Sequence, residues 1–149
     1  MIGTLYVVGT PIGNLGDLSF RARLILSKVA LIAAEDTRVS RKLLNHYEIN
    51  NKIISYHDHN EISQSIKLIE QLKNGLDIAI ISDAGTPCIS DPGYRLINLA
   101  QKEDIKVISI PGPSSLTAAL SISGLPTDRF FFEGFLPSKK GRKTRFEFL

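Results

Sequence analysis

Near its N-terminus the chain reads Thr4-Leu-Tyr-Val-Val-Gly-Thr-Pro-Ile-Gly-Asn-Leu-Gly-Asp17. The first part, Thr4 to Val8, is an apolar run of strand length, and the part that follows is rich in the turn residues glycine and proline. Apolar residues then recur every three or four positions, as on one face of a helix: Leu18, Ala22, Ile25 and Val29. A strand, a glycine-rich loop and a helix in this order predict the first unit of an α/β sheet.

The same alternation continues along the chain. Further strands are expected at about 30–34, 52–56, 77–82 and 105–110. Helices are expected over 40–47, from the N-cap Asn60 to the turn Asn74-Gly75, over 94–102, and after Ser114-Ser115, whose hydroxyls can cap a helix. The predicted fold is therefore α/β, with a five-stranded, mainly parallel sheet flanked by helices.

The character of the sequence changes after Pro126. Arg129 to Glu133 reads as another strand, and a basic cluster follows it. We therefore expect one α/β domain over residues 1–126 and the beginning of a second, incomplete domain over residues 127–149.

The basic cluster accounts for the formal net charge of +3. Residues 139–149 hold five of the 18 basic residues and one of the 15 acidic residues, which leaves the rest of the chain close to neutral. Such a cluster suits the phosphates of a polyanion, although a solvated loop without a partner fits the charge equally well. The candidate contacts are Lys139, Lys140, Arg142 and Lys143.

The N-terminal sequence and the cysteine content indicate the cellular compartment of the protein. No basic segment precedes the first apolar run, and that run ends within a few residues, so neither a signal peptide nor a membrane span is expected. The only cysteine, Cys88, cannot form an intrachain disulfide, and no Cys/His spacing resembles a zinc site. We expect a cytoplasmic protein with no metal site and no membrane partner.

Four unusual loops follow the predicted strands, at the carboxyl ends where parallel sheets bind ligands. They are residues 9–17, 35–38, 83–87 and 111–115. The glycines of the first loop are spaced G-x3-G-x2-G, which differs from a dinucleotide fingerprint, and Pro11 removes an amide that could face a phosphate. An adenosine-type ligand without phosphate, such as S-adenosylmethionine, fits these loops better, while tight turns alone are the structural alternative.

Five segments together resemble a known family. They are Val8-Gly-Thr-Pro-Ile-Gly-Asn-Leu-Gly-Asp17, Ala34-Glu-Asp-Thr-Arg38, His57-Asp-His-Asn-Glu61, Ser82-Asp-Ala-Gly-Thr-Pro87 with Ser90-Asp-Pro-Gly93, and Pro111-Gly-Pro-Ser114. The chain resembles the ribosomal RNA small subunit methyltransferase I family of the tetrapyrrole methylase superfamily. The resemblance covers essentially the whole chain, although family members continue through a complete second domain.

The resemblance implies methyl transfer from S-adenosylmethionine to the 2′-hydroxyl of a cytidine in 16S ribosomal RNA of the small subunit. The expected cofactor residues are Gly9, Pro11, Ile12, Gly13, Asp83, Ala84, Gly85, Thr86, Ser114 and Ser115. The basic cluster would contact the RNA. A homodimer is also expected, since an incomplete second domain should leave apolar surface exposed.

A carboxylate or histidine could accept the proton of the ribose hydroxyl. Glu35 and Asp36 are the catalytic candidates, with Arg38 to orient a carboxylate or phosphate. The alternative for this segment is a helix cap with its own salt bridge, and for His57 and His59 it is a structural turn. Alternative functions are a methylase of a tetrapyrrole or other small molecule, a non-catalytic RNA-binding or dimerisation module, and a dinucleotide oxidoreductase.

Overall fold

The computed structural model describes residues 1–149 and contains one five-stranded sheet. Its strands lie in the order β3-β2-β4-β1-β5, and every neighbouring pair is parallel. Their bounds are β1 Leu5–Val8, β2 Leu31–Ala34, β3 Ile53–Ser55, β4 Ile78–Ile81 and β5 Val107–Ile110. The predicted α/β class and the five predicted strands are thus confirmed.

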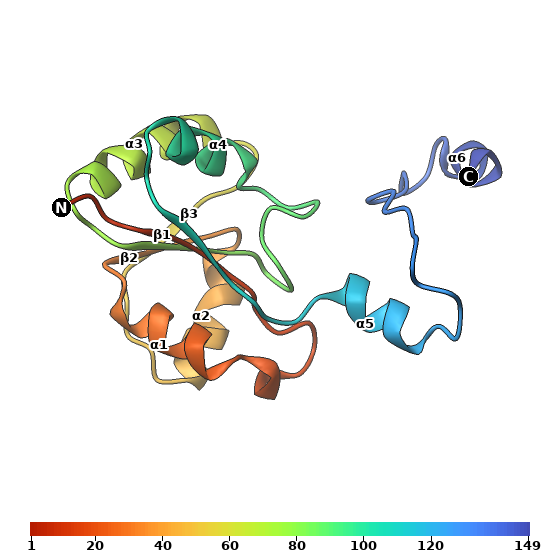
Figure 1. Cartoon of the computed structure of the whole chain (residues 1–149), viewed down its shortest axis with the longest axis horizontal. Coiled ribbons are helices and arrows are strands. Elements are labelled where there is room, and N and C mark those ends of the chain that lie inside the picture. The colour runs from red at the N-terminus through yellow and green to blue at the C-terminus, as the bar shows by residue number, and fades with distance from the viewer.

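Helices cover both faces of the sheet (Figure 1). On one face lie α1 (Phe20–Lys28) and α2 (Thr37–His46), and on the other lie α3 (Glu61–Lys73) and α4 (Tyr94–Lys102). A short 3-10 helix, η1 (Leu15–Asp17), precedes α1. The last helices, α5 (Ser115–Ile122) and α6 (Arg142–Phe148), lie beyond the edge of the sheet.

The core consists of two layers separated by the sheet. Leu68, Leu72 and Leu96 from α3 and α4 pack on one face, and Leu26 and Leu44 from α1 and α2 pack on the other. All four residues of β2 and of β4 are buried. A central parallel strand is covered on both sides, which is why these strands read as continuous apolar runs.

Helix ends show how the sequence sets the boundaries. The Ser19 side chain accepts a hydrogen bond from the backbone N–H of Ala22 and caps α1. After α3, Gly75 has φ = 90°, and the N–H of Leu76 donates to the carbonyl of Gln71. This is the left-handed C-terminal turn predicted from Asn74-Gly75.

Two predicted caps differ in detail. Asn60 occupies the N-cap position of α3, but its side chain accepts from the N–H of His57 and donates to the carbonyl of Ser55. Ser114 is the N-cap residue of α5, but its hydroxyl makes no capping bond, and Ser115 lies inside the helix. Both residues occupy the predicted N-cap position, but neither side chain makes the predicted capping bond. The Asn60 amide makes its hydrogen bonds within the preceding turn instead.

Three further differences concern element bounds. Helix α2 begins at Thr37 instead of Ser40, because Asp36 caps it. The strand predicted over 129–133 does not form, since no neighbouring strand supplies a hydrogen-bonding partner. Helix α6 was not predicted as an element of its own.

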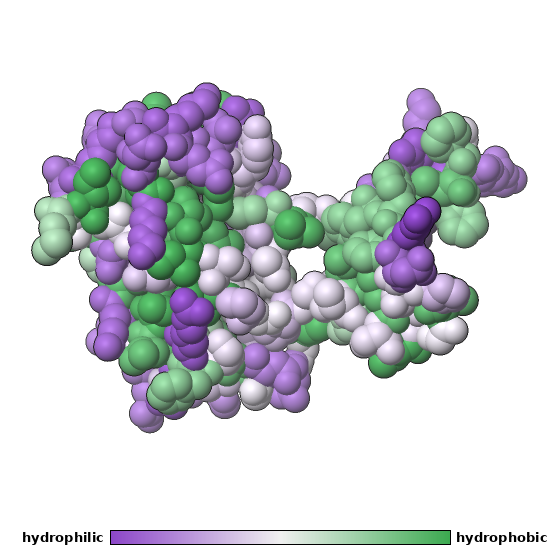
Figure 2. All heavy atoms as spheres, viewed as in Figure 1, coloured by the Kyte–Doolittle hydropathy of each residue, from purple (hydrophilic) through white to green (hydrophobic).

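The segment after α5 is an extended arm with apolar side chains on its surface. Figure 2 shows apolar atoms gathered over it, and Phe131 and Phe135 are 80% and 86% exposed. None of the helices combines the length and apolar character needed to cross a membrane.

Candidate functional site

The connections between strands run in opposite directions across the sheet from its centre, where β4 and β1 lie side by side. The connection from β1 to β2 passes through α1 on one face, and the connection from β4 to β5 passes through α4 on the other. Because β1 and β4 are neighbours, the loops after them diverge from a common point at the carboxyl edge. A crevice at such a reversal is where open α/β sheets bind ligands.

Hydrogen bonds hold the first loop, residues 9–17, to the third loop, residues 83–87. The N–H of Thr10 donates to the carbonyl of Gly85 over 2.8 Å, and the N–H of Gly85 donates back over 3.1 Å. The buried Thr10 hydroxyl also donates to the carbonyl of Ser82 over 3.1 Å. The two loops therefore form one rigid unit, which fixes Gly85 and its neighbours.

Two glycines bring the first and last loops into backbone contact. A Cβ atom on Gly9 would lie 2.9 Å from the Cα of Gly112, and one on Gly112 would lie 3.0 Å from the carbonyl oxygen of Gly9. Neither position leaves room for a side chain. These glycines set the spacing of the loops that carry Ile12 and Ser114.

Two hollows open beside these loops. One, of about 340 Å³, is lined by Ala84, Gly85, Thr86, Ile89, Ser90, Asp91, Ser114, Ser115, Leu116, Phe132, Gly134 and Phe135. The other, of about 560 Å³, is lined by Ile12, Asp17, Gly112, Pro113, Ser114, Thr117, Ala118 and Ser121. Ser114 contributes to both, and both volumes fall within the range of ordinary small-molecule sites.

Six of the ten residues predicted for a cofactor line these hollows, namely Ile12, Ala84, Gly85, Thr86, Ser114 and Ser115. The other four do not. Gly9 and Pro11 are buried, Gly13 has open space around it, and the Asp83 carboxylate accepts from the N–H of Asp36. Sequence reasoning missed Asp91 as a lining residue, although Ser90-Asp-Pro-Gly93 marked its loop.

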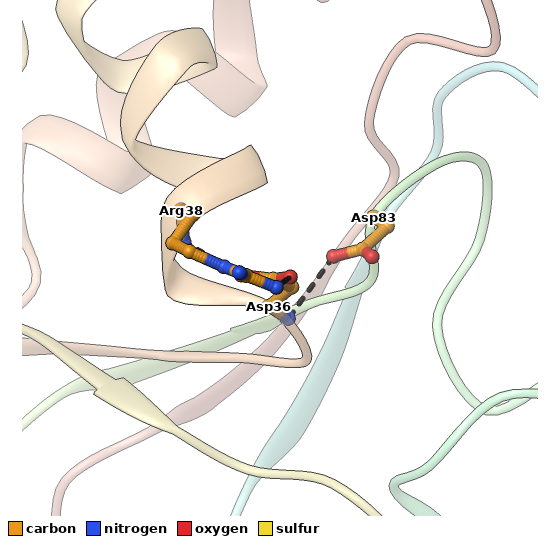
Figure 3. Close-up of polar contacts among 3 residues, drawn as sticks. All are labelled: Asp36, Arg38 and Asp83. Atoms are coloured by element: carbon orange, nitrogen blue, oxygen red, sulfur yellow. Dashed lines mark hydrogen bonds and ion pairs between the residues drawn. The ribbon is translucent and has the colours of Figure 1, made fainter.

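The segment after β2 is a helix cap, as the structural alternative predicted. The Asp36 carboxylate accepts from the N–H of Arg38 at 2.8 Å and pairs with the Arg38 guanidinium at 2.6 Å. Hydrogen bonding by Arg38 lowers the pKa of Asp36 to about 2. Figure 3 shows both side chains beside Asp83, whose oxygen lies 3.0 Å from the Asp36 nitrogen.

Glu35 differs from its neighbour. Its half-buried carboxyl has a raised pKa, first because burial disfavours the charged form and second because Asp83 is close. The charges of Asp91 and Asp58 add to the rise. A carboxylate with a raised pKa is a better proton acceptor, so Glu35 suits the role of a general base better than Asp36 does.

The two histidines lie in a turn outside both hollows. His57 donates its backbone N–H to Asn60, its ring lies 5.8 Å from that of His59, and its Nδ1 atom is buried without a hydrogen-bond partner. Neither histidine lines either hollow.

All four predicted RNA contacts are exposed: Lys139 and Lys140 lie in the turn before α6, and Arg142 and Lys143 lie in its first turn. Lys143 lies 3.7 Å from Glu147, while Lys139, Lys140 and Arg142 form no ion pair. No group of three or more His, Cys, Asp or Glu side chains is arranged to hold a metal ion.

Comparison with known proteins places this architecture in a family. The tetrapyrrole (corrin/porphyrin) methylases match residues 4–148, and the chain belongs to that family. A methylase family implies a methyl donor. Among curated relatives, the protein from Pseudomonas aeruginosa named ribosomal RNA small subunit methyltransferase I is 53% identical over 97% of this chain and 52% of its own length. The protein of the same name from Escherichia coli O157:H7 is 51% identical over 95% of this chain and 50% of its own.

These matches confirm the resemblance seen in the sequence, and the chain spans about half the length of the curated relatives it matches. Two solved structures share the fold. A conserved hypothetical protein from Aeropyrum pernix K1 superimposes with a TM-score of 0.68 at 18% identity, covering 88% of this chain and 46% of that one. Uroporphyrin-III-C-methyltransferase from Thermus thermophilus gives 0.60 at 19% identity, covering 85% and 55%. At such identities the likeness concerns the fold alone.

Proposed function

We propose that the complete protein transfers a methyl group from S-adenosylmethionine to the 2′-hydroxyl of a cytidine in 16S ribosomal RNA of the small subunit. One observation carries the proposal: identity above 50% runs along nearly the whole chain to relatives named for small-subunit ribosomal RNA methylation. The chain covers half of those relatives, so the activity is assigned to the complete protein, in which residues 1–126 form the first domain and residue 127 begins the second.

The lining of the two hollows fits this cofactor. Hydroxyls of Thr86, Ser114 and Ser115 can bond the ribose and the amino acid end, and Ile12 and Leu116 offer apolar contact to the adenine. When bound, S-adenosylmethionine supplies a methyl group on a sulfonium centre. Since the cofactor carries no phosphate, the missing phosphate-binding glycine pattern agrees with it. Gly9 and Gly13 would act through the shape of the first loop, with Pro11 fixing its backbone.

Glu35 is proposed as the general base. Its carboxylate would accept the proton of the 2′-hydroxyl as the ribose oxygen forms its bond to the methyl carbon and the carbon–sulfur bond breaks. Asp36 and Arg38 would hold the loop in position through their ion pair. The bond from the Asp36 N–H to Asp83 ties this loop to the one that borders the smaller hollow.

The exposed basic residues 139–143 would bind RNA phosphates, which is a sequence-independent contribution to affinity. The exposed phenylalanines of the arm would be covered in a homodimer of the complete protein. The proposed ribosomal substrate would place the protein in the cytoplasm.

The decisive test supplies the complete protein with radiolabelled S-adenosylmethionine and either small ribosomal subunits or a porphyrinoid. Label is expected in the RNA, at the 2′-position of a cytidine. The Glu35→Gln variant should bind the cofactor in calorimetry and lose most of its turnover. Label in the porphyrinoid alone would refute the proposed function, and full activity of Glu35→Gln would refute the role of Glu35 as the general base.

A separate variant tests whether the basic cluster contacts the RNA. Reversing the charges of Lys139, Lys140, Arg142 and Lys143 together should weaken methylation of small subunits at moderate salt while cofactor binding stays unchanged. Unchanged methylation would show that these residues do not contact the RNA.

A further inference from the structure

The two helices on one face of the sheet contain no acidic residue. Helices α1 and α2 carry six Lys and Arg side chains, namely Arg21, Arg23, Lys28, Arg38, Arg41 and Lys42. The opposite layer is mixed, because α3 contains Glu61 and Glu70. Ion pairs there join Lys73 to Glu103 and Arg95 to Glu61. The fold therefore places an excess of positive charge on one face of the sheet, while basic and acidic residues are mixed on the other.

Helix α2 arranges its charges in a stripe. Ser40, Leu43 and Leu44 are buried. The residues on the opposite side, at three- and four-residue spacing, are exposed: Arg38, Arg41, Lys42 and Asn45. A helix of ten residues is about 15 Å long, which gives this stripe the reach to contact several phosphates of one strand.

The stripe runs from the carboxyl edge of the sheet to the Tyr47 ring. At its first end, Arg38 lies at the carboxyl edge of the sheet, beside the loop that contains Asp83. At its other end, the guanidinium carbon of Arg23 lies 5.7 Å from the centre of the Tyr47 ring, and His46 meets the same ring edge-on. Arg23 thus extends the stripe onto α1.

Most of this charge has no partner in the protein. Arg38 pairs with Asp36, and the other five basic side chains of α1 and α2 form no ion pair. The acidic residues that flank the two helices in the sequence lie outside them, and only Asp36 forms an ion pair with either helix; they are Asp17, Glu35, Asp36 and Glu48. Unpaired charge of one sign is what a polyanionic partner neutralises.

We propose that the exposed face of α1 and α2 is a second RNA-binding surface, which holds the phosphate backbone of the substrate and leads it to the carboxyl edge of the sheet. This inference rests on the proposed function. Phe20, at the start of α1, is 82% exposed and offers a ring on which an unpaired base can stack. A surface helix that binds membranes needs a broad apolar face turned outward, whereas the outward stripe of α2 is polar.

The test compares matched pairs of substitutions in the complete protein. Arg41→Gln with Lys42→Gln removes two charges from the stripe. Lys67→Gln with Lys102→Gln removes two exposed, unpaired charges from the opposite layer and is the control. Binding of a fluorescent single-stranded fragment of 16S ribosomal RNA is measured from 50 to 200 mM KCl. Melting temperature and calorimetric affinity for S-adenosylmethionine check that the fold and the cofactor site are unaltered.

The stripe variant should reduce the slope of log affinity against log salt by about 1.4 to 1.8, which corresponds to two lost phosphate contacts. The control should leave the slope unchanged. An unchanged slope in the stripe variant, an equal reduction in the control, or no RNA binding by the wild type overturns the proposal. Binding to phosphatidylserine vesicles is measured for the same proteins, and a stripe variant that loses vesicle binding while it keeps its RNA binding also overturns the proposal. If the wild type does not methylate small subunits and the slope still changes, the enzyme assignment fails and the RNA-binding surface stands.

Discussion

Alanine at Gly9 should disrupt the candidate site without touching any lining side chain. The new Cβ atom would lie 2.9 Å from the Cα of Gly112 and 3.0 Å from its nitrogen. Carbon atoms in contact lie about 3.5–4.0 Å apart, so the two backbones must separate by about 0.6 to 1.1 Å. Overpacking of this kind costs about 1–3 kcal/mol. If the separation is confined to the loops, the affinity for S-adenosylmethionine should fall roughly five- to 150-fold.

The same loop provides the control. A Cβ atom on Gly16 would lie 3.3 Å from the Oδ1 atom of Asn14, a side chain that can move at the cost of its exposed hydrogen bond from the Gly16 N–H. Gly16→Ala should therefore lower the stability slightly and bind S-adenosylmethionine nearly as the wild type does. Calorimetry gives the affinity, and urea unfolding gives the stability. Gly112→Ala strains the same contact from the other side and should reproduce the loss. Wild-type affinity and stability in Gly9→Ala would refute the idea that this contact sets the loop spacing.

Three further predictions concern charge and packing. Asp83→Asn keeps an oxygen that can accept the hydrogen bond from the Asp36 N–H, but it removes a charge that raises the pKa of Glu35. The acid limb of the pH profile of kcat/KM should therefore move to lower pH. An unmoved limb would exclude Glu35 as the base. Tyr56→Phe leaves the buried Ser65 hydroxyl unsatisfied and should cost about 1–3 kcal/mol in urea unfolding, with part recovered by adding Ser65→Ala. Leu68→Ala opens a cavity in a fully buried position and should cost about 2–5 kcal/mol by the same measurement, while a loss below 1 kcal/mol would contradict the core described here.

The sheet was predictable because its signals are local. A parallel strand covered on both faces reads as an apolar run, and glycine and proline mark the loops between the runs. The end of α3 at Asn74-Gly75 and the bounds of α4 followed from the same logic. Where a side chain had a choice of partners, as Asn60 did, the sequence did not decide it, because the competing acceptors and donors come from the folded turn.

The site was only partly predictable for a related reason. The four loops were found from their composition, and the carboxyl edge followed from the parallel sheet. Which glycine faces open space and which faces another backbone depends on contacts across a hundred residues, as between Gly9 and Gly112. The raised pKa of Glu35 is likewise tertiary, because it comes from burial and Asp83, whereas the lowered pKa of Asp36 comes from its local pair with Arg38.

Charge shows most clearly what the linear sequence conceals. Outside residues 139–149, the numbers of basic and acidic residues nearly balance, which suggests a domain without net surface charge. The folded chain separates them. All charged residues of helices α1 and α2 are basic. Four carboxylates approach one another at the carboxyl edge of the sheet, namely Glu35, Asp58, Asp83 and Asp91. Carboxylates that favour proton acceptance also repel phosphates. RNA could approach such an edge only if a neighbouring surface offset the repulsion, and the basic face that begins at Arg38 lies where that attraction is required.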